Sequence, residues 1–266
     1  MPIPNLIEEI DIVRPTAILK TFIAATAIAT SFAANAADPA KPSVVIVHGA
    51  FADGSDWAQV IPLLQAKGVH VTAVQNPLSS LEDDVAATKR AVGTRPGKVV
   101  LVGHSWGGTV ITEAGIDDKV AALVYVAAFA PDVGQSTGEL GKPYPPPPGL
   151  AHLKPDSGGF LSLTPEGMSK YFAQDLSAAQ TAVMTATQGP IQAKAFDQKV
   201  SAAAWKAKPN WYIVASADHM IQPQHQQDMA KRIGARVTEL KTSHVPQQVV
   251  PAQVADVILE AVRHVQ

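Results

Sequence analysis

The sequence predicts an α/β protein with a mainly parallel six-stranded sheet, helices on both faces and a helical cap insertion at about residues 130–209. The first observation behind this prediction is that short apolar runs alternate with segments of helical character from Ser43 onward, as in βαβ units. The second is that the run Ser43–Val47 (SVVIV) is almost continuously apolar, which is typical of a strand buried on both faces. The third is size, because 266 residues with 47% hydrophobic and 17% charged residues can bury one large core.

Each element has its own local signal. Ser80 is predicted to cap a helix whose first turn carries three carboxylates, which favour the positive end of the helix dipole. The predicted strands are Ser43–Val47, Val69–Val74, Val99–Val102, Ala121–Val126, Trp211–Ala215 and Arg236–Leu240. The predicted helices of the alternating part are Trp57–Lys67, Leu81–Val92, one from about Gly107, Gln224–Ile233 and Pro246–Val262.

Residues 130–209 break the alternation. This stretch contains the proline-rich loop Tyr144–Gly149 and two helical segments, Pro165–Gln174 and Ser177–Thr187. It leaves the sheet at the carboxyl end of one strand and returns at the start of the next. Ligands of open α/β sheets bind at these carboxyl ends, so we expect the insertion to cover a binding site.

The amino-terminal segment has the pattern of a secretory signal. Residues 21–33 are apolar or small and uncharged, basic residues precede them, and Ala34-Asn35-Ala36 follows. This pattern predicts a signal peptide over residues 1–36, cleaved after Ala36, and an α/β domain over residues 37–266. The predicted location is the bacterial periplasm or the medium. An apolar stretch of this length is too short to span a bilayer, which needs about 20 residues, so no stable membrane anchor is expected.

Charge and composition exclude other classes of function. Lys and Arg number 21 against 23 Asp and Glu, so the chain lacks the excess of basic residues that nucleic acid binding requires. The chain has no cysteine, which excludes disulfides and thiolate chemistry. Nothing in the sequence indicates an oligomeric state.

The strongest chemical signal is Gly103-His104-Ser105-Trp106-Gly107, which fits G-x-S-x-G between a predicted strand and a predicted helix. A serine on such a tight turn is lifted above the sheet, and the flanking glycines let the backbone pack closely. The motif predicts Ser105 as a nucleophile.

A serine nucleophile needs a base, and the base needs an acid. Among eight histidines, His244 lies in the loop between the last strand and the last helix, where the order Ser…Asp…His is satisfied. Asp218 follows the strand Trp211–Ala215 and is the predicted acid; Asp132, after the preceding strand, is the alternative. The other histidines of this region, His104, His219 and His225, are expected to pack or to be solvated.

An oxyanion hole needs two donors. The backbone N–H of Trp106, next to the nucleophile, is one candidate, and that of Ala50, in the loop after the first strand, is the other. His48 is expected to organise this loop.

The chain resembles the α/β-hydrolase superfamily, in the branch that holds plant methylesterases, hydroxynitrile lyases and their bacterial esterase relatives. The matching segments are His48–Ala50, Leu101–Ser105 and Ala127–Asp132, and Asp218 and His244 match the acid and base positions of the family. The lyases of the branch carry a lysine after the catalytic histidine and a threonine at the position of Gly49. Here Val245 follows His244, so the resemblance implies hydrolysis rather than cyanohydrin cleavage.

These observations together predict a serine hydrolase that cleaves carboxylic esters through an acyl-enzyme, without metal or organic cofactor. An aromatic content of only 6% favours an aromatic-poor pocket for small to medium hydrophobic esters. Three alternatives stay open: a cofactor-free perhydrolase, a lactone or amide hydrolase with the same triad, and a ligand-binding protein without turnover.

Overall fold

A six-stranded parallel sheet organises the part of the chain that the computed structural model describes, residues 42–266. The strand order is β2-β1-β3-β4-β8-β9, and every neighbouring pair is parallel, as the sequence predicts. The proposed signal peptide, residues 1–36, lies outside the described residues. The strands are β1 (Ser43–Val47), β2 (Val71–Val74), β3 (Val99–His104), β4 (Val120–Val126), β8 (Asn210–Ala215) and β9 (Arg236–Leu240).

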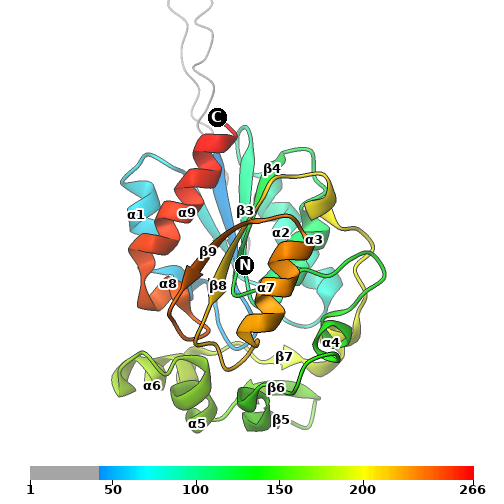
Figure 1. The fold of residues 1–266 in the computed structure, drawn as a ribbon, viewed down its shortest axis with the longest axis vertical. Coiled ribbons are helices and arrows are strands. Elements are labelled where there is room, and N and C mark those ends of the chain that lie inside the picture. Colours follow the sequence, from blue (N-terminus) through cyan, green and yellow to red (C-terminus); the bar gives the residue numbers. More distant parts are fainter. Residues whose placement is uncertain (1–41) are drawn as a thin grey trace, which may run out of the picture. The chain divides into compact units, whose positions relative to one another are not determined.

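Alternate side chains of the strands enter two separate apolar cores. Val45, Leu101 and Tyr212 point to one face, where α2, α3 and α7 pack, while Val44, Val100 and Trp211 point to the other, where α1 and α9 pack. Both faces of the sheet are therefore covered (Figure 1). The helices of these two layers are α1 (Ile61–Gln65), α2 (Leu81–Gly93), α3 (Trp106–Ala114), α7 (Pro223–Arg232), α8 (Pro246–Val249) and α9 (Pro251–His264).

Two predicted helices are wrong in extent. The segment predicted as Trp57–Lys67 forms a 3-10 turn, Gly54–Trp57, followed by the single α-helical turn α1. The predicted helix Pro246–Val262 is divided into α8 and α9 at Val250, whose φ of −134° and ψ of 59° are not helical. The proline that follows Val250 disfavours the helical conformation at that residue.

The segment between β4 and β8 forms the cap insertion. In Figure 1 most of it lies together at the carboxyl ends of the strands. It is less helical than predicted, because a small antiparallel sheet in the order β5-β6-β7 runs through it. Its elements are α4 (Thr137–Gly141), β5 (Leu153–Pro155), β6 (Phe160–Leu163), α5 (Pro165–Gly167), a π-helical turn (Met168–Phe172), α6 (Ala178–Thr187), β7 (Ile191–Gln192) and 3-10 turns at Pro148–His152, Ala193–Asp197 and Ala204–Lys206.

Candidate active site

Ser105 occupies a strained turn between β3 and α3. Its φ of 52° lies in the left-handed region, which is costly for a residue with a side chain. The turn is possible because its neighbours are glycines: a Cβ on Gly103 would lie 2.5 Å from the carbonyl oxygen of Gly107, and a Cβ on Gly107 2.4 Å from that of Val47. The serine is buried but lines a cavity. The strand–turn–helix context that the motif predicts is present.

Asp218 and His244 are brought together from the loops that follow β8 and β9. The distance between Asp218 Oδ2 and His244 Nδ1 is 2.7 Å, and both side chains are buried. His244 also lines the cavity of Ser105. Since Nδ1 is hydrogen-bonded to Asp218, Nε2 is the ring nitrogen that remains to exchange a proton with a group in the cavity.

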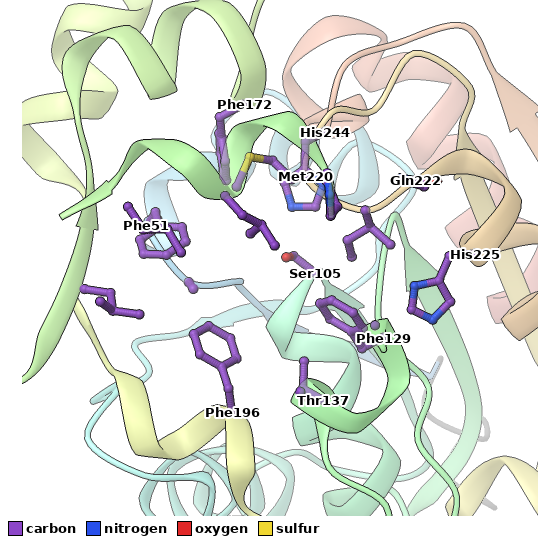
Figure 2. Close-up of a pocket in the computed structure, with 18 of the residues that line it drawn as sticks. Phe51, Ser105, Phe129, Thr137, Phe172, Phe196, Met220, Gln222, His225 and His244 are labelled. Atoms are coloured by element: carbon purple, nitrogen blue, oxygen red, sulfur yellow. The ribbon is translucent and has the colours of Figure 1, made fainter. Parts of the chain in front are cut away.

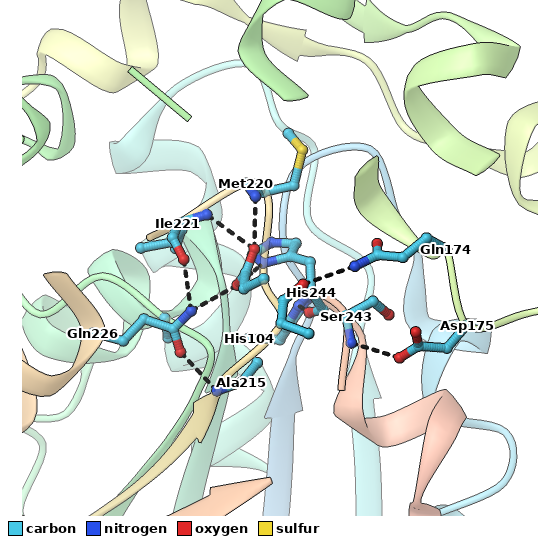
Figure 3. Close-up of polar contacts among 12 residues, drawn as sticks. His104, Gln174, Asp175, Ala215, Met220, Ile221, Gln226, Ser243 and His244 are labelled. Atoms are coloured by element: carbon cyan, nitrogen blue, oxygen red, sulfur yellow. Dashed lines mark hydrogen bonds and ion pairs between the residues drawn. The ribbon is translucent and has the colours of Figure 1, made fainter. Parts of the chain in front are cut away.

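The carboxylate of Asp218 is held by four donors (Figure 3). Oδ1 accepts from the backbone N–H groups of Met220 (2.6 Å) and Ile221 (3.0 Å), and Oδ2 accepts from Gln226 Nε2 (2.7 Å) as well as from His244. Such a carboxylate has few orientations open to it, so it fixes the tautomer and the plane of the His244 ring.

Gln226 is a supporting residue that the sequence analysis misses. It lies in α7 and is completely buried, with its side-chain oxygen accepting from the backbone N–H of Ala215 (2.9 Å) and its nitrogen donating to Asp218. A glutamine in the first turns of a helix carries no motif, so no signal in the sequence could have found it.

His104 packs directly against His244, as the sequence analysis expects. It also makes a hydrogen bond to the backbone of His244. The two ring centres are 4.7 Å apart, and His104 Nε2 lies 2.7 Å from the backbone carbonyl oxygen of His244. Burial lowers the pKa of His104 well below its ordinary value. The ring is therefore neutral, and since a carbonyl only accepts, Nε2 carries the proton and donates it.

The two predicted oxyanion donors come from two different elements of the fold. Ala50 lines the cavity in the loop after β1, and Trp106 is the first residue of α3. The loop of Ala50 is braced by His48, whose Nε2 accepts from the backbone N–H of Asn76 (2.9 Å) and whose Nδ1 donates to the carbonyl of Gly49 (2.8 Å).

A hydrogen bond to Asp84 of α2 fixes the indole of Trp106. Trp106 Nε1 donates to Asp84 Oδ2 at 2.7 Å, and Asp84 Oδ1 accepts from the backbone N–H of Leu78 at 2.8 Å. Burial raises the pKa of Asp84 to about 6. The carboxylate is still the main form at neutral pH, where it orients the residue next to the nucleophile.

The cavity above Ser105 has a volume of about 240 Å³ (Figure 2). The prediction of an aromatic-poor lining is wrong, because four of the seven phenylalanines of the chain contribute to it. Overall composition does not reveal where the few aromatic side chains gather. The apolar lining comes mainly from Ala50, Phe51, Phe129, Leu150, Leu153, Leu161, Phe172, Phe196, Met220 and Ile221, and the polar lining from Ser105, Thr137, Tyr144, Gln222, His225 and His244.

The structure places Asp132 outside the site and His225 in the wall of the cavity. Asp132, the alternative acid, is separate from the site: it forms an ion pair with Lys206 (2.5 Å) and its side chain is partly exposed. His225, expected to be solvated, is only 4% exposed and lines the cavity.

Among residues 42–266 no group of three or more His, Asp or Glu side chains could hold a metal ion. No helix in that range is long and apolar enough to cross a membrane.

Comparisons with known proteins agree with this architecture. The model of a family described as "Alpha/beta hydrolase family" matches residues 44–257. Methylesterase 2 of Arabidopsis thaliana is 26% identical over 257 residues, covering 82% of this chain and 95% of the relative. A pyrethroid hydrolase of Sphingobium wenxiniae is 26% identical over 253 residues, covering 82% and 86%. The crystal structure of polyneuridine aldehyde esterase has a TM-score of 0.71 at 22% identity, covers 83% of this chain and 99% of its own, and shares the fold.

Proposed function

The chain belongs to the alpha/beta hydrolase family, and from that premise we propose that it cleaves carboxylic esters, with Ser105 as the nucleophile, His244 as the base and Asp218 as the acid that orients it. The observation that carries this proposal is the buried Asp218–His244 pair, 2.7 Å apart, on the cavity that Ser105 also lines. The similarity to proteins named methylesterase and pyrethroid hydrolase supports an ester as the substrate.

In the first half of the reaction, Ser105 Oγ attacks the acyl carbon while His244 Nε2 takes the hydroxyl proton. The negative charge that develops on the carbonyl oxygen is stabilised by the backbone N–H groups of Ala50 and Trp106. Asp218 stabilises the imidazolium that forms. The intermediate then collapses, the bond to the alcohol oxygen breaks, and the alcohol leaves with the proton from His244.

In the second half, water attacks the acyl-serine while His244 takes one of its protons, and the same two N–H groups hold the oxyanion. Collapse breaks the bond to Ser105 Oγ, which recovers the proton from His244. The products are a carboxylic acid and the free enzyme. His244 carries each proton that is transferred, first from Ser105 to the alcohol and then from water to Ser105.

The cavity supports a preference for compact hydrophobic esters. Its volume of about 240 Å³ is smaller than the roughly 300–1,000 Å³ of pockets that hold drug-sized ligands. Most of its lining is apolar, so an ester without a charged group near the acyl carbon fits it best. We further propose that the chain is secreted through the signal peptide over residues 1–36, which sequencing the amino terminus of exported protein would test.

The test of the proposed activity is labelling with a fluorophosphonate, together with turnover of p-nitrophenyl esters from acetate to laurate. We expect the wild type to be labelled and to prefer short or medium chains, and the Ser105→Ala variant to be unlabelled. Ser157→Ala, which changes an exposed serine in a turn of the insertion, is the matched control and should behave as the wild type. A folded wild type that is neither labelled nor active would overturn the proposal.

A further inference from the structure

One histidine in the cavity wall has no role in the reaction described above. His225 lies in the first turn of α7, is only 4% exposed, and lines the cavity. No hydrogen bond joins either of its ring nitrogens to residues 42–266, and neither nitrogen is among the fully buried unpaired atoms, so both keep some accessible surface.

Two aromatic rings hold the imidazole of His225, one stacked on its face and the other at a steep angle. It stacks on the ring of Tyr144, with the centres 4.2 Å apart and an angle of 18°, and meets Phe129 at 5.9 Å and 65°. These contacts fix the plane of the imidazole without using its nitrogens. An oriented donor or acceptor that faces a cavity is the usual way in which a pocket recognises a polar atom of its ligand.

The imidazole is neutral at physiological pH. Its pKa is lowered to about 4, mainly by burial and also by the nearby Arg232, with Asp228 offsetting part of the shift. A neutral ring offers one N–H donor and one acceptor, so it suits an uncharged oxygen rather than a carboxylate.

The neighbouring polar side chains already have partners. Tyr144 donates its hydroxyl to Asp228 (2.8 Å), and Thr137 shares a hydrogen bond with Thr109 (2.7 Å). Gln222 donates its amide to the carbonyl of Pro145. His225 is therefore the buried group on this side of the cavity whose hydrogen-bonding capacity is unused among the described residues.

The two sides of the cavity differ in character. In Figure 2, His225 and Gln222 lie on one side of Ser105, and Phe51 and Phe196 lie on the other. A substrate held with its acyl carbon at Ser105 extends toward both sides. One part would meet aromatic rings, and the other would meet the edge of an imidazole.

We propose that His225 is a specificity-determining residue that donates a hydrogen bond to an uncharged oxygen of the substrate, such as a keto or ether oxygen, on the side opposite Phe51 and Phe196. This inference rests on the proposed esterase function and narrows it. The preferred substrates are esters with an apolar group on one side of the scissile bond and an oxygen-bearing group on the other.

Two pairs of isosteric esters test the inference. The first pair, ethyl 4-oxopentanoate and ethyl 4-methylpentanoate, places the oxygen in the acyl part. The second, 2-methoxyethyl hexanoate and butyl hexanoate, places it in the alcohol part. For each pair the measured quantity is the ratio of the two kcat/KM values, which is insensitive to the fraction of a variant that is folded.

We expect the wild type to favour the oxygen-bearing ester in at least one pair, and His225→Phe to lower that ratio about tenfold, as the loss of a buried hydrogen bond implies. His225→Gln, which keeps a donor and an acceptor, should recover part of it. His152→Phe is the matched control: His152 also stacks on a tyrosine, Tyr171 (4.5 Å), but lies outside the cavity lining, so the ratio should not change.

The outcomes separate the two proposals. An active wild type whose ratios are unchanged in His225→Phe for both pairs overturns the role of His225 and leaves the esterase function standing. A wild type that cleaves p-nitrophenyl esters but none of the four test esters overturns this inference alone. A folded wild type that is neither labelled by the fluorophosphonate nor active on any ester overturns the esterase function and this inference with it. A ratio that falls equally in His152→Phe overturns the assignment to His225.

Discussion

The loops at the carboxyl ends of the strands and the insertion that covers them are built in different ways. The loops follow buried parallel strands, and their functional residues are fixed by hydrogen bonds between buried groups, as the four donors to Asp218 illustrate. The insertion consists of short helices and a three-stranded sheet held by turns and local caps, such as the capping boxes at Ser136 and Ser177. The comparison teaches that the proposed reacting groups are held by the loops at the ends of the strands, while the insertion shapes the space around them.

The two regions are joined next to Asp218 and His244, the proposed acid and base. Gln174 of the insertion donates to the carbonyl of Ala217 (2.7 Å), next to Asp218, and Asp175 accepts from the backbone N–H of Ser243 (2.6 Å), next to His244. The insertion therefore supports the loop that carries Asp218 and the loop that carries His244. If this difference holds, changes in the loops after the strands should affect activity more than changes in the insertion.

The largest effect is expected at the nucleophile. Ser105→Ala should lower kcat by about 10⁴–10⁶-fold, because every later step depends on the acyl-enzyme. The free energy of unfolding should change little, since the strained turn keeps its glycines. Steady-state kinetics and urea unfolding measure the two quantities, and near-normal kcat in a folded variant would remove Ser105 from the mechanism.

The next effect concerns the two candidate acids. Asp218→Asn should lower kcat by about 10⁴-fold, because an amide at this position favours the wrong tautomer of His244. Asp132→Asn, which breaks only the partly exposed ion pair with Lys206, should leave kcat within about twofold of the wild type. The reverse order of effects would assign the acid to the loop after β4.

The pH dependence of stability should also differ between the regions. In the α/β part, burial raises the pKa of Asp84 to about 6. In the insertion, the exposed Glu139 has a pKa lowered by the backbone N–H of Ser136, and that of Glu166 is lowered by Lys170. Burial thus favours protonation of Asp84 in the folded state, whereas their hydrogen bonds favour ionisation of Glu139 and Glu166.

Asp84 gives the sign of the effect. Between its ordinary pKa near 4 and about 6, the folded state binds the proton more strongly than the unfolded state, so stability falls as the pH rises through this range and then levels off. Over this pH range the free energy of unfolding of the wild type should fall by about 2–3 kcal/mol. That of Asp84→Asn should not show this fall. Urea unfolding of both proteins from pH 4 to 7 checks this; parallel curves would contradict it.

The smallest effect is expected where the insertion meets the catalytic loops. Asp175→Ala removes the acceptor for the backbone N–H of Ser243 and should lower kcat about two- to tenfold, in keeping with one hydrogen bond. The exposed Asp156, which closes a turn within the insertion, is the control, and Asp156→Ala should leave kcat unchanged. Equal effects of the two changes would mean that the insertion acts as a whole rather than through this contact.

Much of the sheet could be predicted from the sequence because its signals are local. All six strands lie within two residues of their predicted bounds. Five of them are short, mainly apolar runs between turns, while β9 alternates polar and apolar residues. The turn at Ser105 is equally local, because G-x-S-x-G between strand and helix describes a backbone shape. Asp218 and His244 follow from chain order and from the rule that parallel strands end at one edge.

What the sequence could not reveal depends on contacts between distant segments. Gln226 and Asp84 are recognisable only when α7 lies beside Asp218 and α2 beside Trp106. His225 belongs to a predicted helix, but its burial results from Tyr144 of the insertion, 81 positions away in the chain. The strands β5–β7 are too short to show a period, so the insertion was the least predictable part.

The place where the insertion joins the sheet has a consequence for evolution and for engineering. It begins after β4 and ends before β8, and these two strands are neighbours that pair from Leu123–Asn210 to Val126–Ile213. To the sheet, the whole insertion is one long crossover connection, and the length of such a connection has little influence on stability. Another insertion could therefore be transplanted between β4 and β8 without a change of register, provided that it brings its own counterparts of Gln174 and Asp175. New specificities can be acquired by exchanging this one segment while the inherited chemistry stays in place.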